Sequence, residues 1–312
     1  MIQLFKDPNY DFISKRKWAY LLSAGFIILG FISIGLKGGL RHGIDFSGGT
    51  LIQVRFAEAP QIGLIRSALD RIKLGESVIQ EFGDPREFIL RLPLADRPAE
   101  EITRQVQEAL ASESALSKTE IRRVEFVGPQ VGRDLQGQAL YAVLASAAGI
   151  LIYIAIRFDV KGGVAAIIAT FHDVLVTFSA VSLANREISL PVLAAFLTII
   201  GYSVNDTIVA FDRVRENRGK GVRKGVSFAE QINSAINQTL SRTVLTSLTT
   251  FMSAVVLLLF GGKALEDFAF VLTVGVVTGT FSTIYVAGAI LVDWTAWVEG
   301  RAQRAKKAVA KV

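Results

Sequence analysis

The fold of this chain is decided by the stretch Pro191-Val-Leu-Ala-Ala-Phe-Leu-Thr-Ile-Ile-Gly-Tyr-Ser-Val-Asn-Asp206-Thr-Ile-Val-Ala-Phe-Asp212, which is apolar enough to cross a bilayer yet carries a carboxylate. Asp206 lies about 9 Å deeper along such a helix than Asp212. Ionisable groups at that depth are costly, so they usually face a protein interior or a water-filled cavity. If the helix ended early, Asp206 would lie among headgroups, but the apolar residues 208–211 argue against this. Asp206 is therefore the first candidate functional residue.

The composition is that of an integral membrane protein. Hydrophobic residues make up 51% of the 312 residues, and they fall in blocks long enough to cross a bilayer. Cysteine is absent, which excludes disulfides, thiolate metal sites and cysteine nucleophiles. The net charge of +6 says little, because in a membrane protein the positions of Lys and Arg matter more than their sum.

Six blocks are predicted to cross the membrane as helices. The first follows Lys15-Arg16-Lys17 and lacks a small-residue cleavage site, so it is predicted to be an uncleaved span and not a signal peptide. The spans are placed at residues 18–36, 139–156, 162–184, 190–211, 244–260 and 268–294, so that the last five occupy residues 138–294.

The positions of the basic residues predict the orientation. Loop 157–161 and linker 212–242 are basic, whereas turns 185–189 and 261–267 carry one positive charge each. The positive-inside rule therefore places the N-terminus (1–17) and the basic tail (295–312) in the cytoplasm. Within the linker, residues 228–240 are predicted to form an amphipathic helix along the cytoplasmic interface.

Residues 37–137 are predicted to form a water-soluble, extracytoplasmic insert with its own core. Strands are expected at 51–56, 78–82, 88–92 and 121–127, and helices at 60–74 and 100–116, with a hairpin turn at Gly83-Asp84-Pro85. The order β-α-β-β-α-β is that of the ferredoxin-like split motif. That fold serves many functions and identifies no activity.

Arg242 opens the fifth span and heads a polar stripe on one helical face, followed by Thr246, Thr249 and Ser253. Since Asp206 and Arg242 both lie toward the cytoplasmic side, a salt bridge between them is geometrically allowed. Alternatively, Arg242 is one more positive-inside residue and the hydroxyls bond their own helix. The residues alone leave both interpretations open.

His172 and Asp173 lie about 15 Å into the third span, near the bilayer centre. They suit a proton relay, because His titrates near neutral pH, but an intramembrane His also commonly makes structural hydrogen bonds. Gly275 and Gly279 form a Gly-x-x-x-Gly pattern that close helix packing explains fully.

An enzymatic function has little support. The sequence contains no phosphate-binding Gly-rich loop ending in Gly-Lys-Ser/Thr, no His-Glu-x-x-His and no Gly-x-Ser-x-Gly, and His42 has no evident partner. No cofactor or metal site is predicted.

Four stretches together resemble the SecF branch of the SecD–SecF family of bacterial protein-export subunits. The first is Gly43-Ile-Asp-Phe-Ser-Gly-Gly-Thr50, whose signature residues are Gly43, Asp45, Phe46, Gly48 and Gly49. The others are His172-Asp173, Val204-Asn-Asp-Thr-Ile-Val-Ala-Phe-Asp-Arg213 and Ser241-Arg-Thr-Val-Leu-Thr-Ser-Leu-Thr-Thr250. The similarity extends over essentially the whole chain.

The resemblance implies a mainly α membrane protein of six transmembrane helices, half of an RND-type bundle, with an extracytoplasmic α+β ferredoxin-like domain inserted after the first helix. SecD would supply the other half in the inner membrane. Asp206 would be the proton-coupling carboxylate and Arg242 its partner, with Asn205, Asp212, Thr246 and Thr249 as further relay or structural candidates.

The resemblance also implies a function. The complex would use the proton-motive force, or sodium in some relatives, to promote preprotein translocation after the SecA-driven step at SecYEG. YajC and YidC are further candidate partners, and nucleic acid is not expected. Two alternatives remain: half of an RND-type exporter of lipids or small molecules, or a passive assembly scaffold.

Overall fold

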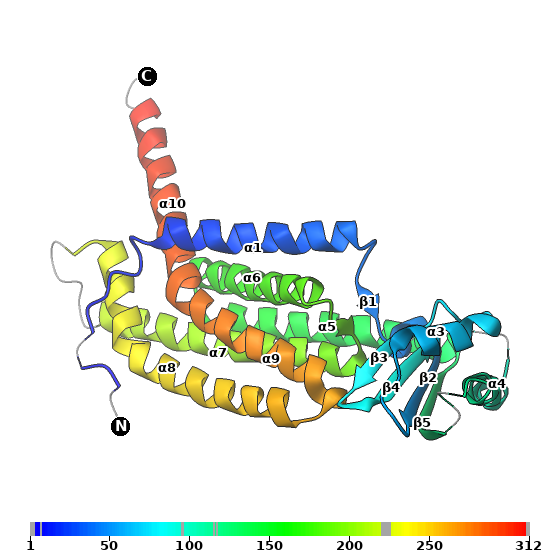
Figure 1. Cartoon of the computed structure of the whole chain (residues 1–312). Helices are drawn as coiled ribbons and strands as arrows, with labels where there is room; N and C mark the ends of the chain where they lie inside the picture. Colours follow the sequence, from blue (N-terminus) through cyan, green and yellow to red (C-terminus); the bar gives the residue numbers. More distant parts are fainter. Residues whose placement is uncertain are drawn as a thin grey trace.

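The structure is a computed structural model that describes residues 4–6, 8–94, 97–114, 116, 118–219 and 226–309, with side chains as far as Arg301. A bundle of long helices carries a small α+β domain at one end (Figure 1). The long helices are α1 (Arg16–Leu36), α5 (Pro129–Arg157), α6 (Val160–Leu183), α7 (Leu190–Gly219), α8 (Phe228–Phe260), α9 (Lys263–Ser282) and α10 (Gly288–Val309).

Six of these segments are long and apolar enough to cross a membrane, counting α9, the π-helical turn η1 (Thr283–Ala287) and α10 as one. The sixth segment is kinked at this turn, where α-helical hydrogen bonding is interrupted (Figure 1). The predicted fold class, six spans with one inserted α+β domain, is thereby confirmed.

Helices α6, α7 and α9 form the interior of the bundle. Small side chains allow this close packing: Ala165, Ala166 and Ala169 of α6 are fully buried. Gly275 and Gly279 of α9 both lie against α7. A methyl group added at Gly275 would come within 2.1 Å of Ile199, and one at Gly279 within 3.3 Å of Ser203.

The inserted domain is a four-stranded antiparallel sheet with the strand order β3-β4-β2-β5, covered by two helices. Alternate side chains of the strands, such as Ile52 and Leu90, pack against Leu69 and Val106 of the helices. The predicted β-α-β-β-α-β order is therefore correct, and the topology is ferredoxin-like. Its elements are β2 (Gly49–Phe56), α3 (Ile62–Arg71), β3 (Val78–Phe82), β4 (Asp84–Leu92), α4 (Ala99–Ala111) and β5 (Thr119–Val127).

Three helices extend beyond the spans predicted for them. Residues 228–240 do not form a separate interfacial helix, because α8 starts at a capping box between Ser227 and Glu230 and continues unbroken to Phe260. Its apolar residues Ile232, Ile236 and Leu240 pack into the bundle core, which explains the amphipathic pattern without a membrane surface.

The other two differences concern helix length. Helix α5 begins at Pro129, so the predicted end of the insert at residue 137 falls inside a helix. The predicted basic tail is largely helical, since α10 runs to Val309. Lys220, Arg223 and Lys224 of the linker, and Lys311 of the tail, lie outside the described residues.

A short segment between α1 and β2 is folded more tightly than predicted. It contains strand β1 (Arg41–His42) and the single-turn helix α2 (Ile44–Ser47), and β1 pairs in parallel with β6 (Glu187–Ile188), in the connection from α6 to α7. Two-residue strands carry no sequence periodicity, so the pattern could not reveal them.

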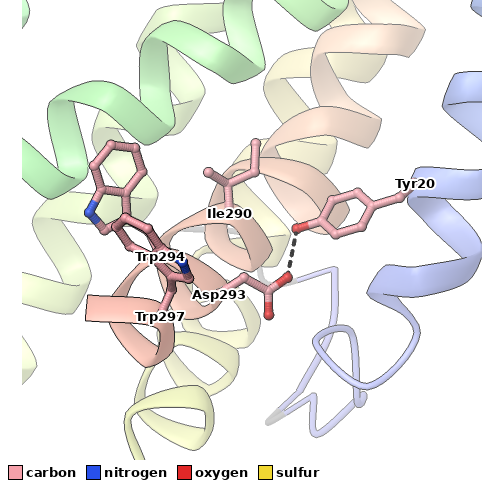
Figure 2. A pocket seen from close by; sticks show the side chains of 5 residues that line it. All are labelled: Tyr20, Ile290, Asp293, Trp294 and Trp297. Carbon is pink, nitrogen blue, oxygen red and sulfur yellow. Dashed lines mark hydrogen bonds between the residues drawn. The ribbon is translucent and has the colours of Figure 1, made fainter. Parts of the chain in front are cut away.

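An apolar pocket of about 500 Å³ between α1 and α10 is lined by Tyr20, Ile290, Asp293, Trp294 and Trp297 (Figure 2). Tyr20 donates a hydrogen bond to Asp293 at 3.3 Å, and Arg16 pairs with the same carboxylate at 2.9 Å. Tyr and Trp rings gather where a bilayer meets water, so we interpret this region as an interfacial anchor.

Candidate functional site

Asp206 lies near the middle of α7, about 24 Å from the first residue of that helix. Its residue surface is 3% exposed, because α7 packs against α6, α8 and α9. The side chain therefore faces protein and not lipid, as expected for an ionisable group at that depth. The neighbouring Asn205, by contrast, is exposed on the outer face of α7.

Hydroxyl groups from three helices meet beside Asp206. Ser247 of α8 donates a long hydrogen bond of 3.5 Å to Asp206 Oδ2. Ser247 in turn accepts from Tyr202 of α7 at 3.1 Å and from Thr280 of α9 at 2.7 Å. A buried carboxylate with a donor at this distance receives little compensation for the water it has lost, so its charge is costly to maintain.

The salt bridge that the sequence allows between Asp206 and Arg242 is not formed in this structure. Among the described residues, no cation lies within 4.0 Å of the Asp206 carboxylate. Arg242 is exposed, although it is near enough to attract Asp206 electrostatically. The pair is open.

A polar cavity of about 1170 Å³ reaches toward this site from the end of the bundle away from the sheet domain. Its lining includes Glu230, Asn237, Arg242 and Thr246, together with the N-terminal residues Phe5, Pro8 and Asn9. Thr246 precedes Ser247, the partner of Asp206. The cavity therefore extends along α8 as far as the residue that precedes Ser247.

The hydroxyls of the predicted polar stripe are bonded within α8. Thr246 donates to Arg242 O at 3.0 Å, Thr249 to Leu245 O at 3.1 Å, and Ser253 to Thr249 O at 3.1 Å. All three residues are exposed in this chain. Thr246 also lines the polar cavity, and its neighbour Ser247 is buried beside Asp206.

Asp212 belongs to a different environment. Its carboxylate forms ion pairs with Arg157 at the end of α5 and with Arg215 of its own helix, and it is partly exposed. The first of these contacts ties α7 to α5.

The side chains of His172 and Asp173 are hydrogen-bonded to each other, although adjacent residues on a helix need not touch. His172 Nδ1 lies 2.9 Å from Asp173 Oδ1, and His172 Nε2 lies 2.7 Å from Ser23 Oγ of α1. The other oxygen of Asp173 accepts from Ser203 of α7 and, at 2.7 Å, from Ser282 of α9. Asp173 is fully buried and links four helices.

The sequence interpretation missed every hydroxyl partner in the two clusters. Tyr202 precedes Asp206 by one helical turn, so its hydroxyl could have been predicted as a neighbour of the carboxylate from helical spacing. Ser247 directly follows Thr246 and could have been considered with it. Ser23 had no such signal, because its contact depends on how α1 packs. Within the described ranges, no group of three or more His, Asp or Glu side chains is arranged to hold a metal.

The signature residues Gly43, Asp45, Phe46, Gly48 and Gly49 lie at the base of the sheet domain. Gly48 and Gly49 have φ of +70° and +126°, which favours glycine, and a methyl group at Gly49 would come within 2.4 Å of Leu92 O. The motif makes the tight entry from α2 into the central strand β2.

Comparisons with known proteins agree with this architecture. Residues 106–297 match the family model "Protein export membrane protein SecD/SecF, C-terminal", and residues 35–59 match the "SecD/SecF GG Motif". The chain belongs to the SecD/SecF family. SecF proteins of Desulfurispirillum indicum and Calditerrivibrio nitroreducens, each named protein translocase subunit SecF, are 44% and 41% identical. The first alignment covers 91% of both chains, and the second covers 93% of this chain and 96% of its relative.

A solved member of the SecD/SecF family shows the same fold. The crystal structure of Thermus SecDF, described as a translocon-associated membrane protein, matches with a TM-score of 0.82 and 39% identity. The match covers 93% of this chain and 39% of the SecDF chain, so this chain spans about two fifths of that protein. These findings confirm a multi-pass membrane protein of the SecF type, an accessory subunit of protein export and not an enzyme.

Proposed function

We propose that this chain is the SecF-type half of a two-subunit membrane machine that assists protein export, with a SecD-type subunit supplying the other half-bundle. The near full-length match to SecF relatives supports the first part. The match to 39% of a SecDF chain supports the second, since SecDF joins a region like this one to a larger remainder. The SecYEG translocon and SecA would act on the same preprotein, and YajC and YidC are further candidate partners.

The orientation proposed is cytoplasmic for both termini and extracytoplasmic for the sheet domain, in the bacterial inner membrane. The first described residues and the end of α10 lie at the end of the bundle away from the sheet domain (Figure 1). Basic residues gather at that same end, as the positive-inside rule requires.

The proposed role is energy coupling, and one observation carries it: Asp206 is buried in the bundle, and no cation of the described residues lies within 4.0 Å of its carboxylate. An ionised Asp206 attracts Arg242 and water, whereas a protonated one does not. Gain or loss of the proton would therefore change how α7 packs on α8 and α9 through Ser247. An elementary charge crossing the membrane potential yields about 2.3 kcal/mol per 100 mV, enough to bias a two-state element.

His172 and Asp173 are proposed to be structural. The Asp173 carboxylate is hydrogen-bonded to three side chains, and none of the three lines the polar cavity. A fully satisfied buried network fixes one arrangement of helices.

The partner surface is proposed to lie on α7 and α8. Each helix exposes a stripe of small or polar side chains at i, i+4, i+7 and i+11 spacing. Small residues and hydroxyls are typical of helix contacts within membranes. The two stripes are Ala194, Thr198, Gly201 and Asn205 on α7, and Arg242, Thr246, Thr249 and Ser253 on α8.

The test is Asp206→Asn, which keeps the side-chain volume but cannot ionise. We expect proton-driven stimulation of preprotein export in inverted vesicles to be lost, with normal recovery of the assembled complex. Asp134→Asn, at an exposed position of α5, is the matched control and should behave as the unmodified protein.

Unchanged proton-driven export would remove Asp206 from the mechanism. Poor assembly, combined with full activity of whatever complex forms, would instead favour the passive scaffold. Repeating the assay with a sodium gradient and no proton gradient identifies the coupling ion.

A further inference from the structure

The signature stretch at the base of the sheet domain contacts the first turn of α7, the helix that carries Asp206. Asp45 Oδ2 accepts a hydrogen bond of 2.9 Å from the backbone N–H of Leu190, the first residue of α7. Asp45 lies 145 residues earlier in the chain, so this cap comes from a different part of the fold.

The first-turn donors of α7 show what Asp45 contributes. Pro191 has no N–H, Val192 N–H points to Ser189 Oγ at 3.5 Å, and Leu193 N–H donates to Ser189 O at 2.9 Å. The N–H of Leu190 has its partner in Asp45. A carboxylate there also interacts favourably with the positive end of the helix dipole.

The backbone next to Asp45 runs along the residues that precede α7. Strand β1 pairs in parallel with β6, with Arg41 opposite Glu187 and His42 opposite Ile188. Gly43 N–H then donates to Ile188 O at 2.8 Å. The contact is close: a methyl group at Gly43 would lie 3.3 Å from Ser189 Cβ.

Side chains of the sheet domain strengthen the same contact. Glu187 of β6 pairs with Arg91 of β4, and with Arg41 of β1 at 3.4 Å. Burial raises the pKa of the Glu187 carboxyl, and the two guanidinium groups oppose that change. The buried carboxylate therefore depends on an arginine supplied by the sheet.

On its other side, the segment that carries Asp45 is bonded to α5 and continues into the sheet. Phe46 O accepts a hydrogen bond of 2.6 Å from Gln136 of α5, and Gly48 and Gly49 lead directly into β2. Strand β2 is central, between β4 and β5. Three residues thus separate Asp45, the cap of α7, from the first residue of the central strand β2.

We propose that Asp45 is a positioning residue that fastens the extracytoplasmic end of α7 to the base of the sheet domain. A shift of α7 at Asp206 is then transmitted to the sheet domain through this contact. This role rests on the proposed energy coupling, and it accounts for an aspartate placed between glycines in the signature: the aspartate caps α7 and the glycines permit the close backbone turns.

The first test is Asp45→Ala in the assembled complex. Loss of a helix cap should speed hydrogen–deuterium exchange in the peptide spanning residues 187–193 by roughly fivefold. Proton-driven export should fall in parallel, at unchanged complex recovery. Asp45→Asn, whose side-chain oxygen still accepts the hydrogen bond, should retain both properties, because Asn caps helices about as well as Asp. Asp134→Ala is the matched control.

The second test replaces the lost Asp45 contact with a disulfide between the signature stretch and the residues before α7. Because the chain has no cysteine, Gly43→Cys with Ser189→Cys adds one defined pair, and disulfides need a Cβ separation near the one expected here. In the Asp45→Ala background, oxidation should restore export and slow the exchange, and reduction should reverse both. Each single cysteine variant is a control.

Two outcomes would overturn the proposal: normal export by Asp45→Ala despite faster exchange, or loss of export when the disulfide is formed beside an intact Asp45. The latter would mean that this contact must open during the cycle. The exchange measurement needs no ion gradient. A failure of Asp206→Asn to affect export would therefore refute the energy coupling separately, without obscuring whether Asp45 fastens α7.

Discussion

The two buried aspartates of the bundle show that burial alone does not define a coupling residue. Asp173 is surrounded by donors, since His172, Ser203 and Ser282 all reach its oxygens. Asp206 has a long contact to Ser247 and no ion pair among the described residues. A satisfied carboxylate stabilises one packing, whereas a poorly compensated one can change its charge state with a change in packing.

Ser282→Ala tests the structural role of the Asp173 cluster. Removing a donor to a buried carboxylate should lower the free energy of unfolding of the bundle by about 1.5–3 kcal/mol. Titration with a denaturing detergent measures the loss. Ser253→Ala is the control, because the Ser253 hydroxyl bonds within α8, and it should change stability by less than about 0.5 kcal/mol. Equal effects of both substitutions would contradict the role given to the cluster.

The sequence predicted the site only as far as local pattern reaches. Asp206 was identifiable because a carboxylate in an apolar helix is costly wherever it lies. The open Asp206–Arg242 pair was not, since it depends on the relative rotation of α7 and α8. The contact between His172 and Asp173 was also unexpected. Adjacent residues on a helix point in different directions, so this contact depends on the rotamers of the two side chains.

At the scale of elements, α7 is the part of the fold on which the others depend. It contributes Tyr202 and Asp206 to one polar cluster and Ser203 to the other, and its first turn is capped by Asp45. Its contact with α9 is close because α9 presents Gly275 and Gly279. A movement of α7 therefore reaches both clusters and the sheet domain.

Gly275→Ala tests how tightly α7 and α9 must pack. The added methyl group would meet Ile199 at 2.1 Å, so the Ile199 side chain or one of the two helices must shift, at a cost of about 1–3 kcal/mol. A lower midpoint of thermal unfolding in detergent checks this expectation. In Gly25→Ala on α1 no atom lies within 4 Å of the new methyl group, and stability should be unchanged or slightly higher. An unchanged unfolding midpoint for Gly275→Ala would mean that α7 and α9 are not closely packed at this position.

The elements themselves were largely predictable, and their ends were not. Long apolar runs and alternating strands gave the six spans and the ferredoxin-like order correctly. The amphipathic pattern of residues 228–240 suggested a surface helix, but its apolar side lies in the bundle core, with Ile232 and Ile236 against Gly288 of α10. A hydrophobic helix face indicates that the face is covered, but the sequence does not distinguish a membrane surface from other helices of the bundle.

At the scale of the whole molecule, the exposed surfaces differ from side to side. Helix α5 exposes Leu144, Ile152 and Tyr153, which suit lipid chains. Helix α7 exposes small and polar side chains such as Thr198, and α8 exposes hydroxyls such as Thr249 beside bulky residues such as Met252. A lone six-helix bundle in lipid has no need for such an asymmetry, whereas one half of a paired bundle does, because small residues allow the partner helices to approach closely.

Thr249→Trp should therefore disrupt the association with the SecD-type subunit. The indole would occupy space that the partner's helices need, and overpacking of about 1–3 kcal/mol corresponds to roughly 5- to 150-fold weaker binding. Co-purification in mild detergent, followed across a dilution series, measures the change. Ile152→Trp, at a 62% exposed position of α5, adds the same ring on the side assigned to lipid and should leave association intact. If Ile152→Trp releases the partner and Thr249→Trp does not, the partner binds the opposite face, and Asp206 would lie away from the interface through which its charge is proposed to act.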